Sequence, residues 1–136
     1  MISILMSTYN REKLLPRAID SVLNQTYKNW DLIIVDGNSN YQSKKIISKF
    51  KKNKKIKIIW VKSNNGAGFN RNLGIKNSRS DYVAFIDSDD IWKKNKLKKQ
   101  IKFMVKKKCD FSYTSYNTID EKNKIIKKIS PPLKFD

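Results

Sequence analysis

The sequence contains no histidine and a single cysteine, Cys109, among its 136 residues. Without histidine, neither a histidine-ligated zinc site nor a Ser-His-Asp catalytic triad is available. One cysteine excludes a disulfide within the chain and fits a reducing compartment. These absences exclude several common kinds of functional site before any motif is considered.

Long apolar runs are also missing from the chain. No segment approaches the roughly 20 apolar residues that a membrane-spanning helix needs. The N-terminal stretch, residues 1–6, is too short and wrongly flanked for a signal peptide. We therefore expect a soluble protein in the cytoplasm.

Acidic residues are scarce relative to basic ones. The chain has 30 Lys and Arg against 12 Asp and Glu, a formal net charge of +18. Such an excess favours nucleic acid, an anionic membrane surface or a phosphorylated small molecule as partner. Arginine, the better reader of bases, occurs only at positions 11, 17, 71 and 79, so we expect no nucleic-acid partner. A general bias toward Lys, Asn and Ile is an equally good explanation of the charge.

Short apolar runs alternate with longer amphipathic stretches, as in a parallel sheet covered by helices. Strands are predicted over residues 2–6, 32–35, 56–61 and 82–86. Helices are predicted over residues 14–23, 42–52, 69–77 and 94–106. The sequence therefore predicts a Rossmann-like α/β fold with a mostly parallel sheet.

The last part of the chain has a different pattern. Alternating residues over 111–116 and 124–129 flank a polar segment at 120–123, which predicts a short β-hairpin. Pro131-Pro132 predicts the end of regular structure. The length suits one compact domain with a single core. We expect one domain over residues 1–136, with an α/β core over 1–108 and the hairpin within 109–130.

Polar residues follow each of the four predicted strands. Tyr9 and Asn10 follow the first strand, Asp36 the second, the glycine-containing loop 63–68 the third, and residues 87–90 the fourth. In an open α/β sheet, ligands bind outside the carboxyl ends of the strands, near a switch in strand order. We therefore expect a binding site at this edge. For Asp36 the alternative stays open that it caps the next helix.

The segment Asp87-Ser88-Asp89-Asp90 holds three carboxylates within four residues. Carboxylates this close repel one another unless a cation or solvent relieves the repulsion. Oxygen ligands of this kind favour Mg²⁺ or Mn²⁺ and leave coordination positions open for substrate phosphates. The segment therefore predicts a divalent-metal site. The alternative is a solvated turn in which Asp90 caps the following helix.

Arg71 lies early in the helix that is predicted after the glycine loop. A helix N-terminus and a planar guanidinium group both favour an anion such as phosphate. The loop has neither the Lys-Ser/Thr pair of a Walker A motif nor the G-x-G-x-x-G spacing. Arg71 is therefore a candidate anion ligand that does not depend on a known phosphate-binding loop. The alternative is an ordinary arginine on the surface of a helix.

These motifs, in this order and spacing, resemble those of the family 2 glycosyltransferases of the GT-A fold. The resemblance is carried by residues 4–11, 21–27, 32–39, 65–74 and 82–92. The motifs are Ser7-Thr8-Tyr9-Asn10, Asp36-Gly37-Asn38-Ser39, Arg71-Asn72 and Asp87-Ser88-Asp89-Asp90. The resemblance extends over residues 2–116, which is nearly the whole chain.

The resemblance implies that the donor is a nucleoside-diphosphate sugar, usually a uridine one. Ser7 and Tyr9 would line the nucleotide site, with Tyr9 against the base. Asp36 belongs to the motif that contacts the base, and Arg71 would approach the base or the diphosphate. Asp87 would contact the ribose or a metal-bound water.

The resemblance also implies a divalent cation, Mn²⁺ or Mg²⁺, coordinated by Asp89. Such a metal bridges the two phosphates and stabilises the negative charge on the leaving diphosphate. The chain departs from the family at Gly37, where relatives usually have a second acid that often bonds the base. Base selection or affinity is therefore expected to differ at this position.

In the family, a later segment supplies the acceptor site and the catalytic base. Nothing after Tyr116 resembles that segment, and Asp120 and Glu121 fit a hairpin turn better than a general base. An inverting transferase needs a base at the attacking hydroxyl. The catalytic base is therefore unknown, and we expect the chain to stop before the acceptor half.

The resulting hypothesis is an inverting glycosyltransferase that uses a UDP-linked sugar in surface polysaccharide or glycoconjugate synthesis. Its acceptor would be a sugar or a lipid-linked sugar. A cationic surface would suit peripheral contact with an anionic membrane at its inner face. The alternative is a non-catalytic nucleotide-sugar-binding fragment or a degenerate transferase domain.

Overall fold

The structure is a computed structural model that describes residues 1–131. The chain divides into two compact units, Met1–Lys96 and Leu97–Asp136. The predicted boundary after residue 108 falls inside the second unit, and the single domain over 1–136 stays a prediction. The sequence predicts that regular structure ends at Pro131-Pro132. Pro132 lies outside the described residues.

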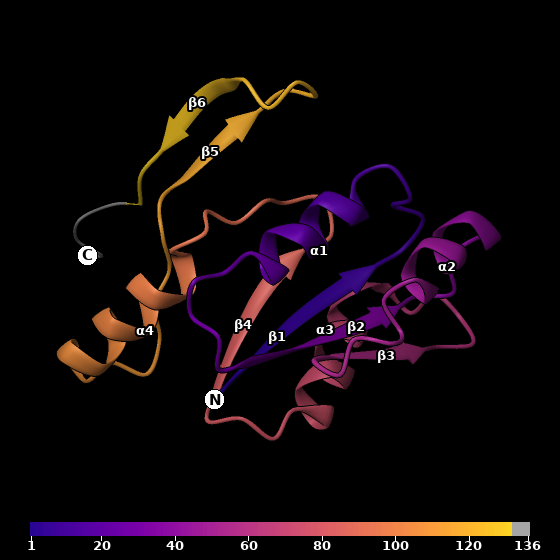
Figure 1. The fold of residues 1–136 in the computed structure, drawn as a ribbon, viewed down its shortest axis with the longest axis horizontal. Helices are drawn as coiled ribbons and strands as arrows, with labels where there is room; N and C mark the ends of the chain where they lie inside the picture. Colours follow the sequence, from indigo (N-terminus) through magenta and orange to yellow (C-terminus); the bar gives the residue numbers. More distant parts are fainter. Residues whose placement is uncertain (132–136) are drawn as a thin grey trace. The chain divides into compact units, whose positions relative to one another are not determined.

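The first unit is built on a four-stranded parallel sheet, visible in Figure 1. Its strands are β1 (Ile2–Thr8), β2 (Trp30–Asp36), β3 (Ile56–Trp60) and β4 (Tyr82–Asp87). Their order in the sheet is β3-β2-β1-β4. The chain therefore builds outward from β1 to β3 and then returns to the other side of β1. The switch in strand order lies between β1 and β4, where ligands of open α/β sheets bind.

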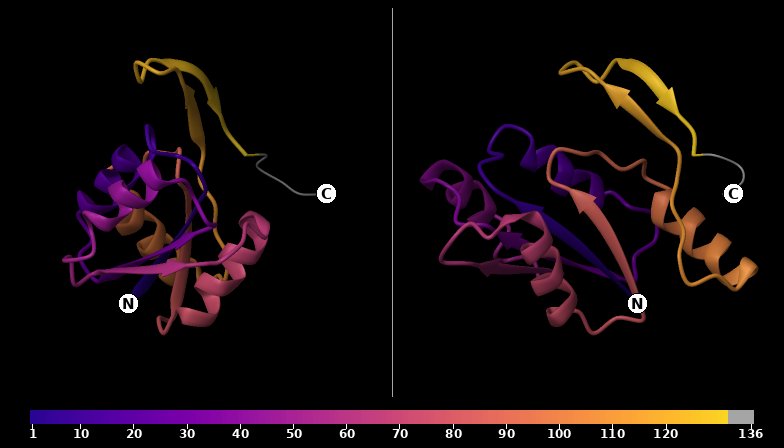
Figure 2. Two further views of the ribbon diagram at one scale, coloured as in Figure 1. Left: turned by 90° about the vertical axis from the view of Figure 1, so that its right-hand side faces the viewer. Right: turned by 180° about the vertical axis from the view of Figure 1, so that it is seen from behind.

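Helices cover both faces of this sheet. They are α1 (Leu15–Leu23), α2 (Tyr41–Ser48) and α3 (Gly66–Asn77). Figure 2 shows α1 and α2 on one side of the sheet and α3 on the other. Right-handed crossover connections require this arrangement, because the connection through α3 runs in the opposite direction along the sheet. The predicted parallel α/β fold is confirmed.

The hydrophobic core lies on both faces of the two central strands, which explains their nearly continuous apolar sequences. Leu5, Ile33 and Val35 form one cluster, packed against the half-buried Ile59 and Leu73. The alternate residues of β1 and β2 point to the other face. The fully buried residues of these strands and of the helices α1 and α2 include Ile4, Met6, Leu32, Ile34, Leu15, Ile19, Val22 and Ile47.

The helix α3 approaches the sheet closely at Gly74. A Cβ atom at this position would lie 3.3 Å from both Cδ atoms of Leu5. Contacts this short leave little space for a side chain, so the glycine lets the helix backbone rest on β1. Asn70 lies one helical turn earlier on the same buried face. The close packing of α3 therefore brings a polar side chain to the carboxyl end of the sheet.

Two helix boundaries differ from those predicted by three residues or more. The helix predicted over 69–77 begins at Gly66, so the glycines at 66 and 68 form its first turn. Gly66 has φ +85°, and its amide donates to Asn64 Oδ1 over 3.1 Å. The helix predicted over 42–52 ends at Ser48, because the next amides bond three residues back in tighter turns. The lysines beyond it belong to the loop that leads to β3.

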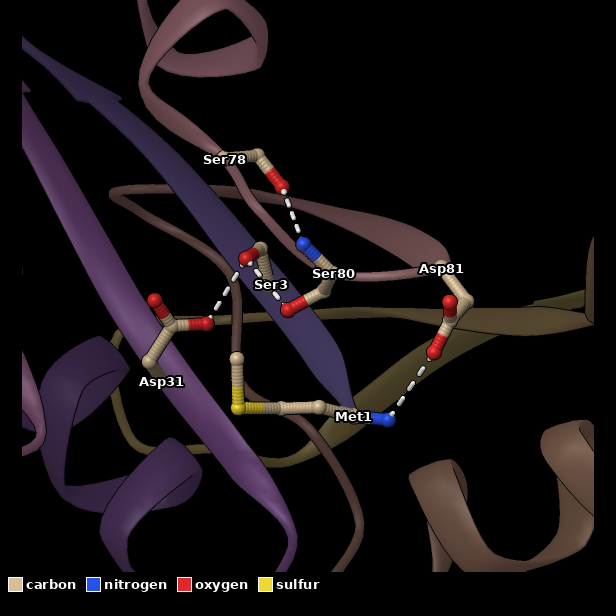
Figure 3. Close-up of polar contacts among 6 residues, drawn as sticks. All are labelled: Met1, Ser3, Asp31, Ser78, Ser80 and Asp81. Atoms are coloured by element: carbon tan, nitrogen blue, oxygen red, sulfur yellow. Dashed lines mark hydrogen bonds and ion pairs between the residues drawn. The ribbon is translucent and has the colours of Figure 1, made fainter.

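At the amino ends of the strands, polar contacts join β1, β2 and the segment before β4 (Figure 3). Ser3 Oγ donates to Asp31 Oδ1 over 2.7 Å and shares a hydrogen bond of 2.9 Å with Ser80 Oγ. The N-terminal ammonium group lies 3.4 Å from Asp81 Oδ2. The polar groups at the amino ends of the strands therefore pair with one another.

The second unit contains a helix and a hairpin. The helix α4 (Lys96–Lys107) starts at the boundary between the units, and β5 (Tyr116–Ile119) pairs antiparallel with β6 (Ile125–Ile129). The predicted hairpin is confirmed, but its first strand does not begin at residue 111. Gln100 Nε2 donates to both the carbonyl oxygen and the hydroxyl of Ser112, at 3.0 and 2.9 Å. These bonds occupy backbone that the prediction assigned to a strand.

Within residues 1–131, none of the helices combines the length and the apolar character needed to cross a membrane.

Candidate functional site

The carboxyl ends of three strands bring the predicted site residues side by side. In the pairing of β1 with β2, Thr8 lies opposite Asp36. In the pairing of β1 with β4, Ser7 lies opposite Asp87. Three predicted site residues, Ser7, Asp36 and Asp87, therefore share one edge of the sheet at the switch in strand order. The sequence predicted this edge from the polar residues that follow each predicted strand.

Asp36 is fully buried and orders the turn that follows β2. Its Oδ1 accepts a hydrogen bond of 3.0 Å from the amide of Ser39. The Ser39 hydroxyl in turn accepts from the amide of Asn10, over 2.9 Å. The cap of α2 is Asn40, whose Oδ1 accepts from the amide of Ser43. Asp36 therefore holds two loops of the site together, and the alternative that it caps α2 is wrong.

Arg71 and Asp87 form the shortest ion pair of the site. The Nη2 atom of Arg71, on α3, lies 2.6 Å from Oδ1 of Asp87, at the end of β4. Arg71 is half-exposed and Asp87 is exposed, so both groups remain accessible to a ligand. The structure thus places the predicted anion ligand directly beside the first carboxylate of the acidic segment.

The acidic segment folds into a turn after β4. The amide of Asp90 donates to the carbonyl oxygen of Asp87 over 3.0 Å. Asp89 is 44% exposed, and its Oδ2 lies 3.8 Å from Nε of Arg11. Partial burial raises the pKa of the Asp90 carboxyl, and the charges of Asp87 and Asp89 raise it further. The segment therefore carries an excess of negative charge that two arginines relieve only in part.

The oxygen donors of this segment fit a hard divalent cation. Within residues 1–131, no three His, Cys, Asp or Glu side chains come close enough to hold a metal among them. Mg²⁺ is normally held by only one or two carboxylates, with water and substrate phosphates completing its shell. The exposed Asp89 and the raised pKa of Asp90 suit such a site. The donor set therefore fits the predicted metal, with coordination positions left open for other oxygen ligands.

Ser7 and Tyr9 differ in their surroundings. Tyr9 is 44% exposed directly after β1, so its ring is accessible from solvent. Ser7 is half-buried, and its hydroxyl oxygen accepts a hydrogen bond of 3.1 Å from Asn70 Nδ2. Asn70 is not among the site residues that the sequence predicts. The one available signal was its position four residues before Gly74, on the face of α3 that packs against the sheet.

Asp120, which the sequence assigned to a turn, lies in the connection between β5 and β6. Its Oδ1 accepts from the amides of Lys122 and Lys124, at 2.9 and 2.8 Å. These two bonds give its carboxylate a structural task within the hairpin. A catalytic base is not identified among the described residues.

Nearly the whole chain matches one family model. Residues 3–135 match the model described as glycosyl transferase family 2. The chain belongs to this family. The family membership that the resemblance predicted is therefore confirmed.

Two relatives illustrate the extent of the match within glycosyl transferase family 2. An uncharacterized glycosyltransferase of Rickettsia felis is 42% identical over 128 residues, which are 94% of this chain and 21% of the relative. WfgD of Escherichia coli, a UDP-Glc:alpha-D-GlcNAc-diphosphoundecaprenol beta-1,3-glucosyltransferase, is 37% identical over 99% of this chain and 53% of WfgD. The chain thus spans between a fifth and a half of the length of these relatives.

A solved structure supports the same fold. The structure of S. aureus TarS 1-349 in complex with UDP-GlcNAc is similar to this chain, with a TM-score of 0.72 and 29% identity. The match covers 77% of this chain and 31% of that one. The predicted GT-A fold is therefore confirmed. The roles of the individual residues in this family 2 chain stay predictions.

Proposed function

We propose that this chain is the donor-binding part of a glycosyltransferase that uses a UDP-linked sugar. The observation that carries the proposal is the alignment of Ser7, Asp36 and Asp87 at the switch in strand order. Arg71 from α3 reaches the same place. The similarity to TarS in complex with UDP-GlcNAc and to WfgD, named for UDP-Glc, supports uridine as the nucleoside.

In this proposal, Tyr9 packs on the base and the Ser7 hydroxyl bonds to the nucleotide. Asp87 bonds to the ribose or to a metal-bound water. Arg71 moves from Asp87 to the diphosphate, which offers two negative groups to its planar donors. Asp36 contributes by holding the turn after β2, through its bond to Ser39.

Asp89 is the residue that would hold the divalent cation, Mn²⁺ or Mg²⁺. When bound, the cation supplies a positive charge that stabilises the leaving diphosphate. Asp89 suits this task because it is exposed and its ion-pair partner, Arg11, lies 3.8 Å away. The acidic turn loses its internal repulsion when a cation binds.

Replacing Arg71 with alanine is expected to weaken UDP binding about tenfold, because a charge-assisted hydrogen bond to phosphate is lost. Arg71→Lys should bind UDP with an affinity between those of the unaltered chain and Arg71→Ala, since lysine keeps the charge but lacks the planar fork of donors. Calorimetric titration of UDP in the presence of Mn²⁺ measures both. Arg79→Ala is the matched control, because Arg79 is exposed and precedes the amino end of β4. Equal losses in both alanine variants would show that only net charge matters.

The reaction proposed for the whole protein is transfer by single displacement with inversion, in surface polysaccharide or glycoconjugate synthesis. WfgD is named for an acceptor that is linked to diphosphoundecaprenol. A lipid-linked acceptor would bring the protein to the inner face of the membrane from the cytoplasm, and a net charge of +18 favours an anionic surface. Co-sedimentation with anionic vesicles at low salt tests this part. Equal recovery with neutral vesicles would contradict it.

The experiment that tests the donor site is titration of UDP into the purified chain, with and without Mn²⁺. Binding that requires the metal supports the proposal, and absence of binding under both conditions contradicts it. Incubation with UDP-GlcNAc or UDP-Glc then separates two forms of the proposal. Release of UDP indicates a catalytic chain, whereas tight binding without release indicates a non-catalytic binding domain.

A further inference from the structure

Gly37 follows β2 directly, at the position where the resemblance to family 2 implies a second acid. Its backbone does not require glycine, because among residues 1–131 the glycine with positive φ is Gly66. The restriction at Gly37 is one of space. A Cβ atom here would lie 3.0 Å from Asn70 Nδ2 and 3.4 Å from the carbonyl oxygen of Thr8. The amide group of Asn70 therefore occupies the space where a side chain at position 37 would begin.

Asn70 is 2% exposed and is fixed from one side only. Its Nδ2 donates to Ser7 Oγ over 3.1 Å, whereas its Oδ1 is buried and has no hydrogen-bond partner within residues 1–131. Asp36 Oδ2 and Thr8 Oγ1, in the paired ends of β1 and β2, are buried without partners as well. Buried polar atoms without partners are uncommon in folded proteins and call for an explanation. Of these three residues, Asn70 is the one whose side chain would meet a Cβ at Gly37.

The direction of the bond between Asn70 and Ser7 has a chemical consequence. Because Ser7 Oγ accepts from Asn70, its own proton is free to be donated elsewhere. Ser7 is half-buried at the end of β1, beside the exposed ring of Tyr9. A hydroxyl held in this way offers both a donor and a remaining lone pair. A carboxylate at position 37 would offer acceptors only.

We propose that Asn70 takes the place of the missing acid, by holding the Ser7 hydroxyl as the group that reads the base of the donor. This inference rests on the proposed donor function. Asn70 is a positioning residue, and Gly37 leaves the space that the Asn70 amide group needs. Uracil carries a donor at N3 and cytosine carries an acceptor there. A carboxylate favours uracil, whereas a hydroxyl that donates and accepts tolerates both. The chain should therefore discriminate between uridine and cytidine diphosphates less sharply than a relative with the acid.

Titration of UDP and of CDP, each with Mn²⁺, tests the inference in a set of variants. Asn70→Ala and Ser7→Ala should each weaken UDP binding about fivefold. The double variant should be no weaker than Ser7→Ala alone, because the two residues act through one hydroxyl. Asn77→Ala is the matched control, since Asn77 bonds to Leu73 and Lys57 at the far end of α3. It should bind both nucleotides as the unaltered chain does.

Variants at position 37 give the decisive comparison. Gly37→Asp alone should weaken binding, because its Cβ meets the Asn70 amide at 3.0 Å. Gly37→Asp combined with Asn70→Ala should regain UDP binding and raise the preference for UDP over CDP about tenfold. A purely structural role of Asn70 would lower the melting temperature of Asn70→Ala and leave the nucleotide preference unchanged.

Two negative results are distinguishable. If the unaltered chain binds UDP, and Asn70→Ala, Ser7→Ala and the double variant at 37 and 70 keep its affinities and its preference, the inference is overturned and the donor site stands. If the unaltered chain binds neither UDP nor CDP, the proposed function itself fails and the inference with it. Should Asn70→Ala not fold, Ser7→Ala and Gly37→Ala report on the same hydroxyl, and unchanged UDP binding in both overturns the inference.

Discussion

Asp89→Ala is expected to weaken the Mn²⁺-dependent binding of UDP by about 100-fold, because it removes the carboxylate that would hold the cation. The fold should be unaffected, since Asp89 is 44% exposed and lies 3.8 Å from Arg11, itself half-exposed. Calorimetric titration of UDP at fixed Mn²⁺, and of Mn²⁺ at fixed UDP, measures the loss from both sides. The affinity for UDP without Mn²⁺ should change little, because Asp89 is proposed to contact the cation and not the nucleotide.

Asp81→Ala is the matched control for this experiment. Asp81 is 83% exposed and lies 3.4 Å from the N-terminal ammonium group, at the opposite end of β4. It removes the same charge from the chain without touching the acidic turn. Asp89→Ala and Asp81→Ala variants that bind UDP and Mn²⁺ equally well would contradict the assignment of the metal ligand.

Leu5→Ala is expected to lower the free energy of unfolding by about 3 kcal/mol, because it leaves a cavity in a core that cannot fully collapse. Leu5 is 2% exposed and packs with Ile33 and Val35 beneath α3. Urea denaturation followed by circular dichroism measures the change. Ile75→Ala is the control, because Ile75 lies on α3 but is 46% exposed, and surface substitutions cost about 0.5 kcal/mol or less. Similar losses in both variants would contradict the packing described for α3.

The contact between Leu5 and Gly74 sharpens this test. In the unaltered chain, a Cβ at Gly74 meets the Leu5 side chain at 3.3 Å, so Gly74→Ala crowds the core. In the Leu5→Ala background the crowding is relieved, and alanine also favours the helix over glycine. The effect of Gly74→Ala on the free energy of unfolding should therefore be more favourable in the Leu5→Ala background than in the unaltered chain, by about 1 kcal/mol. Simple additivity would indicate that α3 does not rest on β1 at this point.

The parallel sheet was predictable because its signal is local and strong. The central strands β1 and β2 are apolar on both faces, and the amphipathic helices between the strands favour right-handed crossovers. These patterns place Ser7, Asp36 and Asp87 at the carboxyl edge without any knowledge of their contacts. The family motifs add the same residues independently. The fold, and the edge of the sheet at which these three residues lie, therefore follow from the sequence.

What the sequence did not reveal depends on contacts between distant residues. The bond from Asn70 to Ser7 spans 63 residues, and only the packing of α3 against β1 brings the two together. The ion pair between Arg71 and Asp87 has the same origin. Gln100 donates to the carbonyl oxygen of Ser112, in a segment that was predicted as a strand. Local patterns carry none of this information, because each contact depends on how whole elements pack.

The central claim is that the carboxyl edge of the sheet binds a uridine nucleotide with a divalent cation. Amide NMR spectra of the ¹⁵N-labelled chain, recorded with UDP and Mg²⁺ and then with Mn²⁺, test it most directly. We predict shifts gathered in residues 7–10, 36–39, 65–71 and 87–90, with paramagnetic broadening by Mn²⁺ strongest around Asp89. No shifts with UDP, or shifts confined to residues 1–3 and 78–82 at the opposite edge, would contradict the claim.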